Sequence, residues 1–484
     1  MTLQTAIKDE PSALLRPRPS QGAAWLRHIG LLNDYVRIPY ANGSSFATQF
    51  LYREFRKRGQ EVTVVGPDDP SATSADLPAR YVMLKALPLR NHPGVRMPLP
   101  SPRALARVAA QRFDLVLGQT NSELTELGLW LRATQHVPFV AVNTLHLRSA
   151  YNVVLPDVLA KQQWFTDLLD ARLVPSLEAH AARVYNQSDG LVVLCRGLAR
   201  YWQERGVRVP IHVLPRSVEP KIFDAKLSGD PFPQRAQRGQ RLLVVCRHTR
   251  EKSVDRLLRV FARHILPLHP RATLTLVGDG PEHDALRALA IELGVAASTF
   301  FPGEHSVTEI PRYYRHADLF LYASLSETYG QVVSEAMWCG LPVVAFADGM
   351  GVSDQVEHGK TGALIEPGPY CTDADEELGA TVSRLLRNPS ERRQLAEQAV
   401  RSTRARVHPR GVIERYDELF EQARAHCSRT TEQRISVPFA SLAALGRWSA
   451  VQSLALGLGC LRRPSVINRH GRKQPSWDAL EHEG

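Results

Sequence analysis

The sequence has few cysteines, and they form no pattern. The 484 residues contain six of them, at positions Cys195, Cys246, Cys339, Cys371, Cys427 and Cys460, with no C-x-x-C pair and no His pair at zinc-ligand spacing. Disulfide-stabilised domains and structural zinc sites need closely spaced ligands. We therefore expect reduced thiols in a cytoplasmic protein, with no structural metal.

Long hydrophobic runs are also missing. A membrane-spanning helix needs roughly 18 to 20 uninterrupted apolar residues, and the nearest candidate, 439–461, is broken by Arg447 and glycines. Residues 1–22 contain acidic residues and prolines but no apolar run, unlike a signal peptide. We expect this N-terminus to be flexible and any membrane contact to be peripheral, on the cytosolic face.

The sequence has fewer acidic than basic residues. The chain has 60 Lys and Arg against 49 Asp and Glu, a formal net charge of +11. This excess favours anionic partners such as nucleotides, acidic lipid headgroups or nucleic acid. Neither zinc-finger spacing nor an RNA-binding aromatic signature is present, so we expect no nucleic-acid partner.

Two halves of the chain repeat one theme, a buried apolar run followed by a turn and a helical pattern. This order is typical of parallel βα units. The predicted strands are 28–33, 61–66, 113–118, 138–143, 190–194, 211–214, 241–246, 272–278, 299–302, 319–322, 342–346 and 362–365. The sequence thus predicts an α/β protein with two doubly wound, Rossmann-like domains facing each other across a cleft.

The composition also suggests where the domains divide. We expect a first domain over 23–218, a Pro- and Gly-rich linker over 219–240 and a second domain over 241–412. Residues 413–429 are predicted to form a helix that crosses back to the first domain. Residues 430–484 are predicted to form a basic amphipathic tail.

The most informative segment is 319–347, LFLYASLSETYGQVVSEAMWCGLPVVAFA. It reads as a strand, a polar loop, a helix that begins at Gly330 and a second strand. A helix N-terminus beside a glycine can bind an anion such as a diphosphate. Glu327 and Glu335 could hold sugar and ribose hydroxyls; alternatively, Glu327 caps the helix and Glu335 is solvated.

This segment resembles the E-x7-E signature of the retaining family 4 glycosyltransferases, which have the GT-B fold. RLLVVCRHTREKSVDRLLRV, residues 241–260, is similar to the strand and loop in which that family binds the donor diphosphate. The resemblance implies catalytic roles for Glu327, Arg247 and Lys252. It implies donor-binding roles for Thr328, Tyr329, Gly330, Gln331, Val332 and Glu335.

Weaker similarities extend over residues 28–427. The resemblance implies that the first domain, 23–218, is on the acceptor side and that the second, 241–412, binds the nucleotide sugar. Gly278 lies in a segment similar to the family's strand-to-helix turn below the donor, and Gly43 and Ser44 match a loop that faces the donor phosphates. His146 follows a strand end, where the family often has a histidine that contacts the transferred sugar. It could equally be structural. The departures from the family pattern include Cys246, Ser253 and the hinge LPRSVE at 214–219.

By resemblance, the chain transfers a hexose from a nucleoside diphosphate sugar, such as a UDP-sugar, to a hydroxyl acceptor with retention. The base and the oligomeric state stay open. No metal or other cofactor is expected. The D-x-D at Asp373 to Asp375 is interpreted as the start of a helix, where acidic residues favour the helix dipole.

The acceptor is predicted to be a membrane lipid. Aromatic and basic residues alternate in 46–58, and the tail has apolar residues at helical spacing, a pattern that suits an anionic membrane surface. Both could instead pack on the protein itself, 46–58 as a core helix. The alternatives are a soluble or polysaccharide acceptor, or a non-catalytic GT-B binding protein.

Overall fold

The structure of this chain is a computed structural model. It describes residues 25–34, 43–70, 72–73, 77–88, 96–119, 124–144, 146, 162–325, 327–430 and 437–461. The predicted flexible segment 1–22 and the end of the tail, 462–484, lie outside the described residues.

The first domain is built on a seven-stranded parallel sheet with the strand order β3-β2-β1-β6-β7-β8-β9. Its strands are β1 His28–Asn33, β2 Glu61–Pro67, β3 Tyr81–Leu84, β6 Leu115–Gln119, β7 Phe139–Val142, β8 Gly190–Val193 and β9 Ile211–Val213. A small antiparallel pair, β4 Ala86–Pro88 and β5 Arg96–Pro98, lies beside it. The helices are α1 Gly43–Lys57, α2 Pro102–Ala109, α3 Leu124–Gln135, α6 Gln163–Leu168, the π-helix η3 Leu169–Leu173, α7 Val174–Tyr185 and α8 Arg196–Glu204.

The second domain has a six-stranded parallel sheet with the order β12-β11-β10-β13-β14-β15. Its strands are β10 Arg241–Val245, β11 Thr273–Val277, β12 Thr299–Gly303, β13 Leu319–Tyr322, β14 Val343–Phe346 and β15 Gly362–Ile365. The helices from the segment between the sheets onward are α9 Pro220–Phe223, α10 Val254–Val260, α11 His283–Glu292, α12 Ile310–His316, α13 Gln331–Trp338, α14 Gly351–Gln355, α15 Asp373–Arg387, α16 Pro389–Val407, α17 Pro409–Thr430 and α18 Val437–Leu461.

These two doubly wound sheets confirm the predicted GT-B architecture. Every strand predicted from an apolar run is present. Apolar runs identify these strands because a parallel strand covered by helices on both faces must be apolar on both. The sequence prediction missed β3, β4 and β5, which are short. Their burial alternates or is incomplete, so they leave no continuous apolar run.

The first sheet has a hydrophobic core on each face. Leu31 and Val64 point to the face covered by α1 and α17, whereas Leu32 and Val65 point to the face covered by α3 and α8. Neighbouring residues of a strand alternate between faces, so one apolar run supplies both cores. The second sheet has a core of its own, to which Phe223 and Phe232 of the segment 219–240 also belong.

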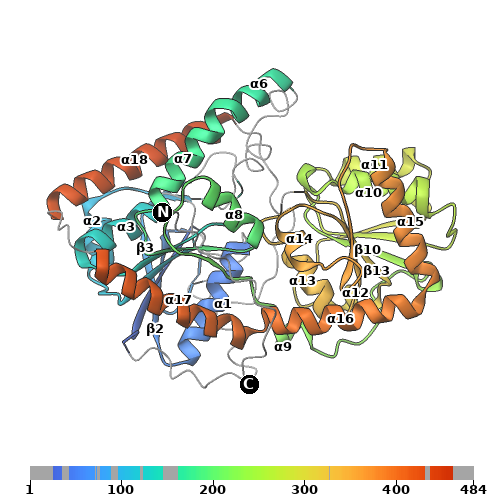
Figure 1. The fold of residues 1–484 in the computed structure, drawn as a ribbon, viewed down its shortest axis with the longest axis horizontal. Helices are drawn as coiled ribbons and strands as arrows, with labels where there is room; N and C mark the ends of the chain where they lie inside the picture. Colours follow the sequence, from blue (N-terminus) through green and yellow to red (C-terminus); the bar gives the residue numbers. More distant parts are fainter. Residues whose placement is uncertain are drawn as a thin grey trace, which may run out of the picture.

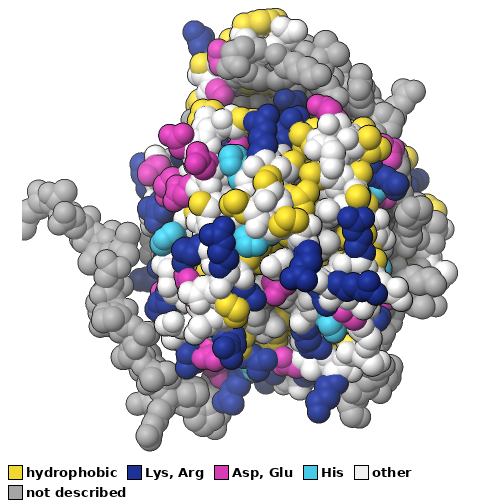
Figure 2. Space-filling model, turned by 90° about the vertical axis from the view of Figure 1, so that its right-hand side faces the viewer, with side chains coloured by type: hydrophobic (Ala, Val, Ile, Leu, Met, Phe, Trp, Pro, Cys, Tyr) yellow, Lys and Arg dark blue, Asp and Glu magenta, His cyan; other side chains and the backbone are white. Residues whose placement is uncertain are grey.

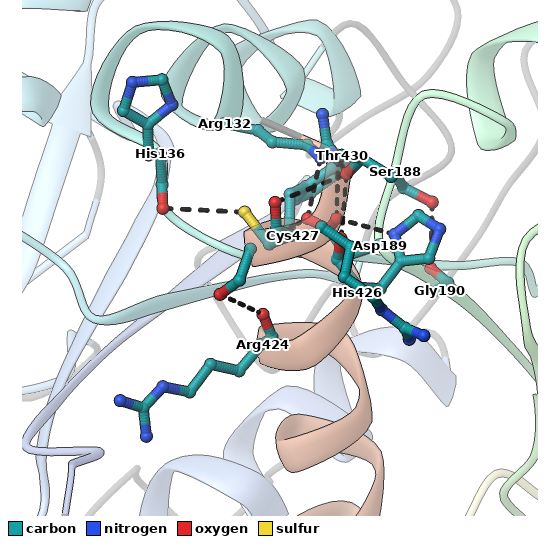
Figure 3. Close-up of polar contacts among 12 residues, drawn as sticks. Arg132, His136, Ser188, Asp189, Gly190, Arg424, His426, Cys427 and Thr430 are labelled. Carbon is teal, nitrogen blue, oxygen red and sulfur yellow. Dashed lines mark hydrogen bonds and ion pairs between the residues drawn. The ribbon is translucent and has the colours of Figure 1, made fainter. Parts of the chain in front are cut away.

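Helices α16 and α17 connect the two domains along the lower edge of Figure 1. After α16, which packs on the second domain, α17 contributes Tyr416 and Phe420 to the core of the first domain. The C-terminal end of α17 is fixed by Asp189, which is fully buried (Figure 3). Its carboxylate accepts hydrogen bonds from Arg132 Nε and Nη2, both at 2.8 Å, and contacts His426 Nδ1 at 3.0 Å.

The aromatic residues of α1 face the protein and not a membrane. Leu51, Tyr52 and Phe55 are buried in the first-domain core. On the same helix, Arg53 is buried and bonds Glu219 at 2.6 Å, and Arg58, directly after the helix, bonds Asp417 at 2.7 Å. Of the two interpretations of this helix, the structure therefore supports the core helix.

The tail helix α18 packs along α3, also in the first domain. Trp448 is fully buried, and its indole N–H donates to the backbone oxygen of Pro98 at 3.0 Å. Arg447 bonds the buried carboxylate of Glu126 at 2.6 Å. Phe439 and Leu442 near the start of α18 stay exposed, so only part of the predicted apolar stripe packs on the protein.

Each sheet reverses its winding between two neighbouring strands, β1 and β6 in the first and β10 and β13 in the second. In open parallel sheets, ligands bind beyond the carboxyl ends of the strands at this point. The loops after β10 and β13 contain residues 246–253 and 323–330, the two segments with the strongest motifs. Both lie in the part of the second domain that faces the first domain (Figure 1).

Candidate active site

An ion pair joins the loops that follow β10 and β13. Lys252 Nζ donates to Glu327 Oε1, and Tyr322 OH donates to the same oxygen at 2.8 Å. The side chains of Lys252 and Glu327 are only 16% and 13% exposed. The structure thus brings together two residues that lie far apart in the sequence and that the motifs singled out separately.

The pair is charged. Burial by itself would raise the pKa of Glu327, but the Lys252 ammonium and the hydrogen bonds from Lys252 and Tyr322 hold this pKa below its usual value. Burial likewise opposes the charge on Lys252, and Glu327 outweighs it and raises the pKa of Lys252. A carboxylate and an ammonium are therefore both present at neutral pH.

Helix α13 begins at Gln331, four residues after Glu327. Gly330, its N-cap, has a φ of 77° and a ψ of 60°, a left-handed conformation that glycine adopts without strain. The N–H groups in the first turn of a helix lack intrahelical partners and carry partial positive charge. They begin at Gln331 and Val332, beside the Lys252–Glu327 pair.

Glu335 is not on a solvated helix face. It is buried, and its Oε2 accepts a hydrogen bond from the hydroxyl of Tyr314 at 3.0 Å. Burial and the nearby Glu335 charge raise the pKa of Tyr314 well above its usual value, so the phenol keeps its proton and donates. Tyr314 on α12 thus orients the second carboxylate of the E-x7-E motif.

Arg247 follows β10 and is exposed. Its side chain forms no ion pair with any of the described carboxylates. Below it, Gly278 has a φ of 136°, and a Cβ there would lie 1.9 Å from the backbone oxygen of Cys246. A larger residue at 278 would therefore push the β11 turn away from the loop that carries Arg247.

His146 lies in the first domain, after β7. Its ring packs edge-on against Tyr201 of α8, with 4.7 Å between the ring centroids. The hydroxyl of Tyr201 donates to Glu178, and Arg205 bonds the same carboxylate at 2.6 Å. The sequence analysis did not single out Tyr201 or Glu178, because nothing in the local pattern links them to His146.

The two domains touch at the site. Thr328 Oγ1 donates to the backbone oxygen of Thr144 at 3.1 Å, so the loop that carries Glu327 contacts the loop that leads to His146. Farther along the cleft, Arg196 of α8 bonds Asp354 of α14 at 2.5 Å. A Cβ at Gly197 would lie 2.3 Å from the backbone oxygen of Gly349, so these backbones are in close contact.

Other predicted site residues are only partly described. Gly43 and Ser44 form the first turn of α1, but their side chains lie outside the described residues. Tyr329 is buried, and its hydroxyl bonds Ser334 at 2.8 Å and the backbone oxygen of Arg216 at 3.0 Å. Tyr329 therefore supports the loop from beneath.

Asp375 of the D-x-D sequence makes structural contacts within the second domain. The buried Asp375 bonds Arg256 Nε at 2.5 Å and accepts a hydrogen bond from the backbone N–H of Cys371 at 2.6 Å. Among the described residues, no three His, Cys, Asp or Glu side chains gather into a group that could hold a metal ion.

The excess of basic residues is not concentrated on the face that Figure 2 shows. There, Lys and Arg side chains are spread among acidic, hydrophobic and uncharged ones. No helix in the described part of the chain is both long and apolar enough to cross a membrane.

Comparison with known proteins identifies the family. Residues 41–221 match glycosyltransferase family 4, and residues 231–402 match glycosyl transferases group 1. A D-inositol 3-phosphate glycosyltransferase of Acidothermus cellulolyticus is 30% identical over 452 residues, which are 86% of this chain and 95% of that protein. The chain belongs to glycosyltransferase family 4.

Two further proteins place this glycosyltransferase among its relatives. The alpha-monoglucosyldiacylglycerol synthase of Streptococcus pneumoniae is 24% identical over 357 residues, covering 70% of this chain and 77% of that protein. The crystal structure of Anabaena Alr3699/HepE in complex with UDP and glucose matches with a TM-score of 0.61 at 17% identity, covering 82% of this chain and 99% of that one. This structural likeness supports the GT-B fold.

Proposed function

We propose that this glycosyltransferase transfers a hexose from a nucleoside diphosphate sugar to a hydroxyl acceptor with retention of configuration. The observation that carries the proposal is the half-buried Lys252–Glu327 pair beside the N-terminus of α13, at the point where the second sheet reverses its winding. The HepE structure with UDP and glucose supports a donor of this class.

In the proposed step, the bond between the anomeric carbon and the diphosphate oxygen breaks, and the acceptor oxygen bonds that carbon from the same face. The acceptor proton passes to the departing phosphate oxygen, so no enzyme nucleophile and no metal are needed. Negative charge grows on the diphosphate as the bond breaks. Lys252, Arg247 and the first N–H groups of α13 would stabilise this charge.

The remaining roles follow from position. Glu327 would orient the hexose hydroxyls while it keeps Lys252 charged, and Glu335 would bind the ribose. His146 would contact the hexose from the first domain, and Gly43 and Ser44 would face the diphosphate across the cleft. The backbone at Gly278, Thr328 and Tyr329 would shape the floor of the donor site.

A transfer assay with purified protein tests this assignment. Each of several nucleotide sugars is paired with lipid vesicles or soluble sugars, and the product anomer is identified by NMR. We expect transfer with one donor, an α-linked product from an α-linked donor, and loss of at least about 100-fold in kcat for Glu327→Ala. Glu357→Ala, which removes an exposed carboxylate paired with Lys360, is the matched control. Unchanged turnover in Glu327→Ala would contradict the assignment.

We propose that the acceptor is a membrane lipid. Large exposed apolar side chains occur on α6 and η3 and near the start of α18; they are Trp164, Leu168, Leu173, Val437, Phe439 and Leu442. In Figure 1, α6 lies at the top of the first domain, and α18 begins at the left edge of this domain and runs up towards α6. Exposed aromatic and aliphatic side chains of this kind insert into the interface of a bilayer. The name of the diacylglycerol-directed relative supports the same acceptor class.

Sedimentation with anionic vesicles tests the membrane surface. The double variant Trp164→Ser, Leu168→Ser and the double variant Phe439→Ser, Leu442→Ser should each bind vesicles several-fold more weakly than the unsubstituted protein. Leu268→Ser with Ile291→Ser, two exposed apolar residues of the second domain, should bind normally. Equal binding by all variants would contradict this surface.

A soluble acceptor is the second candidate. The D-inositol 3-phosphate glycosyltransferase, which aligns over most of both chains, favours it by its name. Transfer to a sugar phosphate in solution, at the same rate with and without vesicles, would establish this alternative and would assign the exposed apolar residues another role.

A further inference from the structure

Arg216 is an unexpected residue in the hinge between the two domains. It follows β9, on the segment where the chain first crosses to the second domain. The neighbouring Ser217 Oγ and Val218 N–H both donate to the backbone oxygen of Val407, at 2.9 and 3.3 Å. The two crossing segments are therefore joined next to Arg216.

The backbone at Arg216 is fastened to the start of α13. The hydroxyl of Tyr329 donates to the oxygen of Arg216 at 3.0 Å, and Gln331 Nε2 donates to the oxygen of Ser217 at 3.2 Å. Tyr329 and Gln331 flank Gly330, the N-cap of α13. Arg216 is thus held at the hinge side of the candidate donor site.

Among the described residues, the guanidinium of Arg216 has no carboxylate in ion-pair contact. Its Nε is buried without a hydrogen-bond partner in this part of the chain. Burial lowers the pKa of Arg216 to about 10, partly offset by Tyr329, Tyr416 and Glu327. The residue is partly exposed, but its enclosed Nε has no partner, and largely buried charges of this kind normally bind an ion of opposite sign.

Two further arginines make this region more positive. Arg406 Nη2 contacts Gln355 Oε1 at 3.4 Å, and Arg415 bonds the backbone oxygen of Arg406. Burial raises the pKa of Tyr329, and the nearby charges of Arg406 and Arg415 reduce this rise. In the described part of the chain, neither is in an ion pair, so this end of the cleft has an uncompensated positive charge.

We propose that Arg216 binds a phosphate oxygen of the donor diphosphate from the hinge, opposite Lys252. The planar guanidinium matches two phosphate oxygens, and the desolvated setting strengthens the interaction. Because Arg216 belongs to the first crossing and Lys252 to the second domain, the donor would then link both sides of the hinge. This inference rests on the proposed nucleoside diphosphate sugar donor.

Calorimetric titration tests the inference. Dissociation constants of UDP, GDP, inorganic pyrophosphate and the two nucleosides are measured for the unsubstituted protein, Arg216→Met and Arg216→Lys. For the diphosphate that binds best to the unsubstituted protein, we expect the dissociation constant to rise by about tenfold or more in Arg216→Met. The rise should be smaller in Arg216→Lys, which keeps a positive charge. The affinity for nucleosides should be unchanged in both variants. Arg404→Met, which removes a charge paired with Asp224 on the surface, should bind normally.

The outcomes separate the claims. A lower melting temperature for Arg216→Met with unchanged diphosphate affinity would make Arg216 structural and overturn the inference alone. Unchanged diphosphate affinity with a raised KM for a phosphate-bearing acceptor would assign Arg216 to the acceptor and also overturn it. If the unsubstituted protein binds neither UDP nor GDP, the proposed function fails and the inference fails with it.

Discussion

Thr328 and Thr144 form a hydrogen bond of 3.1 Å across the cleft between the two domains. One partner is a side chain next to Glu327, and the other is the backbone two residues before His146. The bond therefore connects the two loops from which the proposed sugar contacts come.

Replacing Thr328 with valine removes this bond but preserves the side-chain shape. The contact between the two loops should lose about 1 kcal/mol, the usual net value of a neutral hydrogen bond. We expect the KM for the donor to rise a few-fold with little change in kcat. Thr328→Ser, which keeps the hydroxyl, should restore the KM. A KM for Thr328→Val equal to that of the unsubstituted protein would show that this contact does not govern donor binding.

Arg247 and Lys252 should respond differently to substitution. The exposed Arg247 is in no ion pair with the described residues, so Arg247→Ala should fold normally and lower kcat by about 100-fold. Lys252→Met should lose at least as much activity and also stability, because it leaves the half-buried Glu327 without its counter-ion. Turnover and the melting temperature are measured for both.

Lys360→Met is the control for this pair, since Lys360 forms only an exposed ion pair with Glu357. Loss of stability without loss of turnover in Lys252→Met would assign Lys252 to the fold rather than to the diphosphate.

Asp189 should matter for stability. Asp189→Asn replaces a fully buried carboxylate that binds Arg132 through both oxygens. The free energy of unfolding of the first domain should fall by about 3 kcal/mol, because the Arg132 charge loses its partner. Hydrogen exchange should also speed up at the C-terminal end of α17. Asp417→Asn, at the more exposed pair with Arg58, should cost less; an equal or larger cost would contradict this ranking.

The buried His248 predicts a loss of stability in acid. Burial, reinforced by the adjacent His283 and opposed by Asp279, lowers the pKa of His248 from 6.5 to about 4. The unfolded chain takes up this proton near pH 6.5 and the folded chain only near pH 4, so stability falls as the pH drops through this range. The difference corresponds to about 3 kcal/mol.

Chemical denaturation between pH 7 and 4 checks this value. His248→Leu should lose about 3 kcal/mol less stability than the unsubstituted protein over that range. His180→Leu, an exposed histidine on α7, should follow the unsubstituted protein. Parallel curves for His248→Leu and the unsubstituted protein would show that this proton is not linked to folding.

The sequence by itself determined the two sheets and the proposed donor-site motifs. Buried parallel strands must be apolar on both faces, so the strands appear as runs such as 241–246 and 319–322. Glu327, Gly330 and Glu335 lie on one loop and helix, where local spacing fixes their order. The helices α15, α16 and α17 likewise follow from their local patterns.

Only the tertiary structure decided which side chains meet. Two examples are the Thr328–Thr144 bond and the Arg216 Nε, which is buried with no hydrogen-bond partner among the described residues. Both depend on how distant segments approach. The same holds for the amphipathic helices. Interleaved aromatic and basic residues in α1 suit a membrane or a core equally well. In the structure, the apolar residues of α1 are buried in the core because the first sheet and α17 present an apolar surface to them.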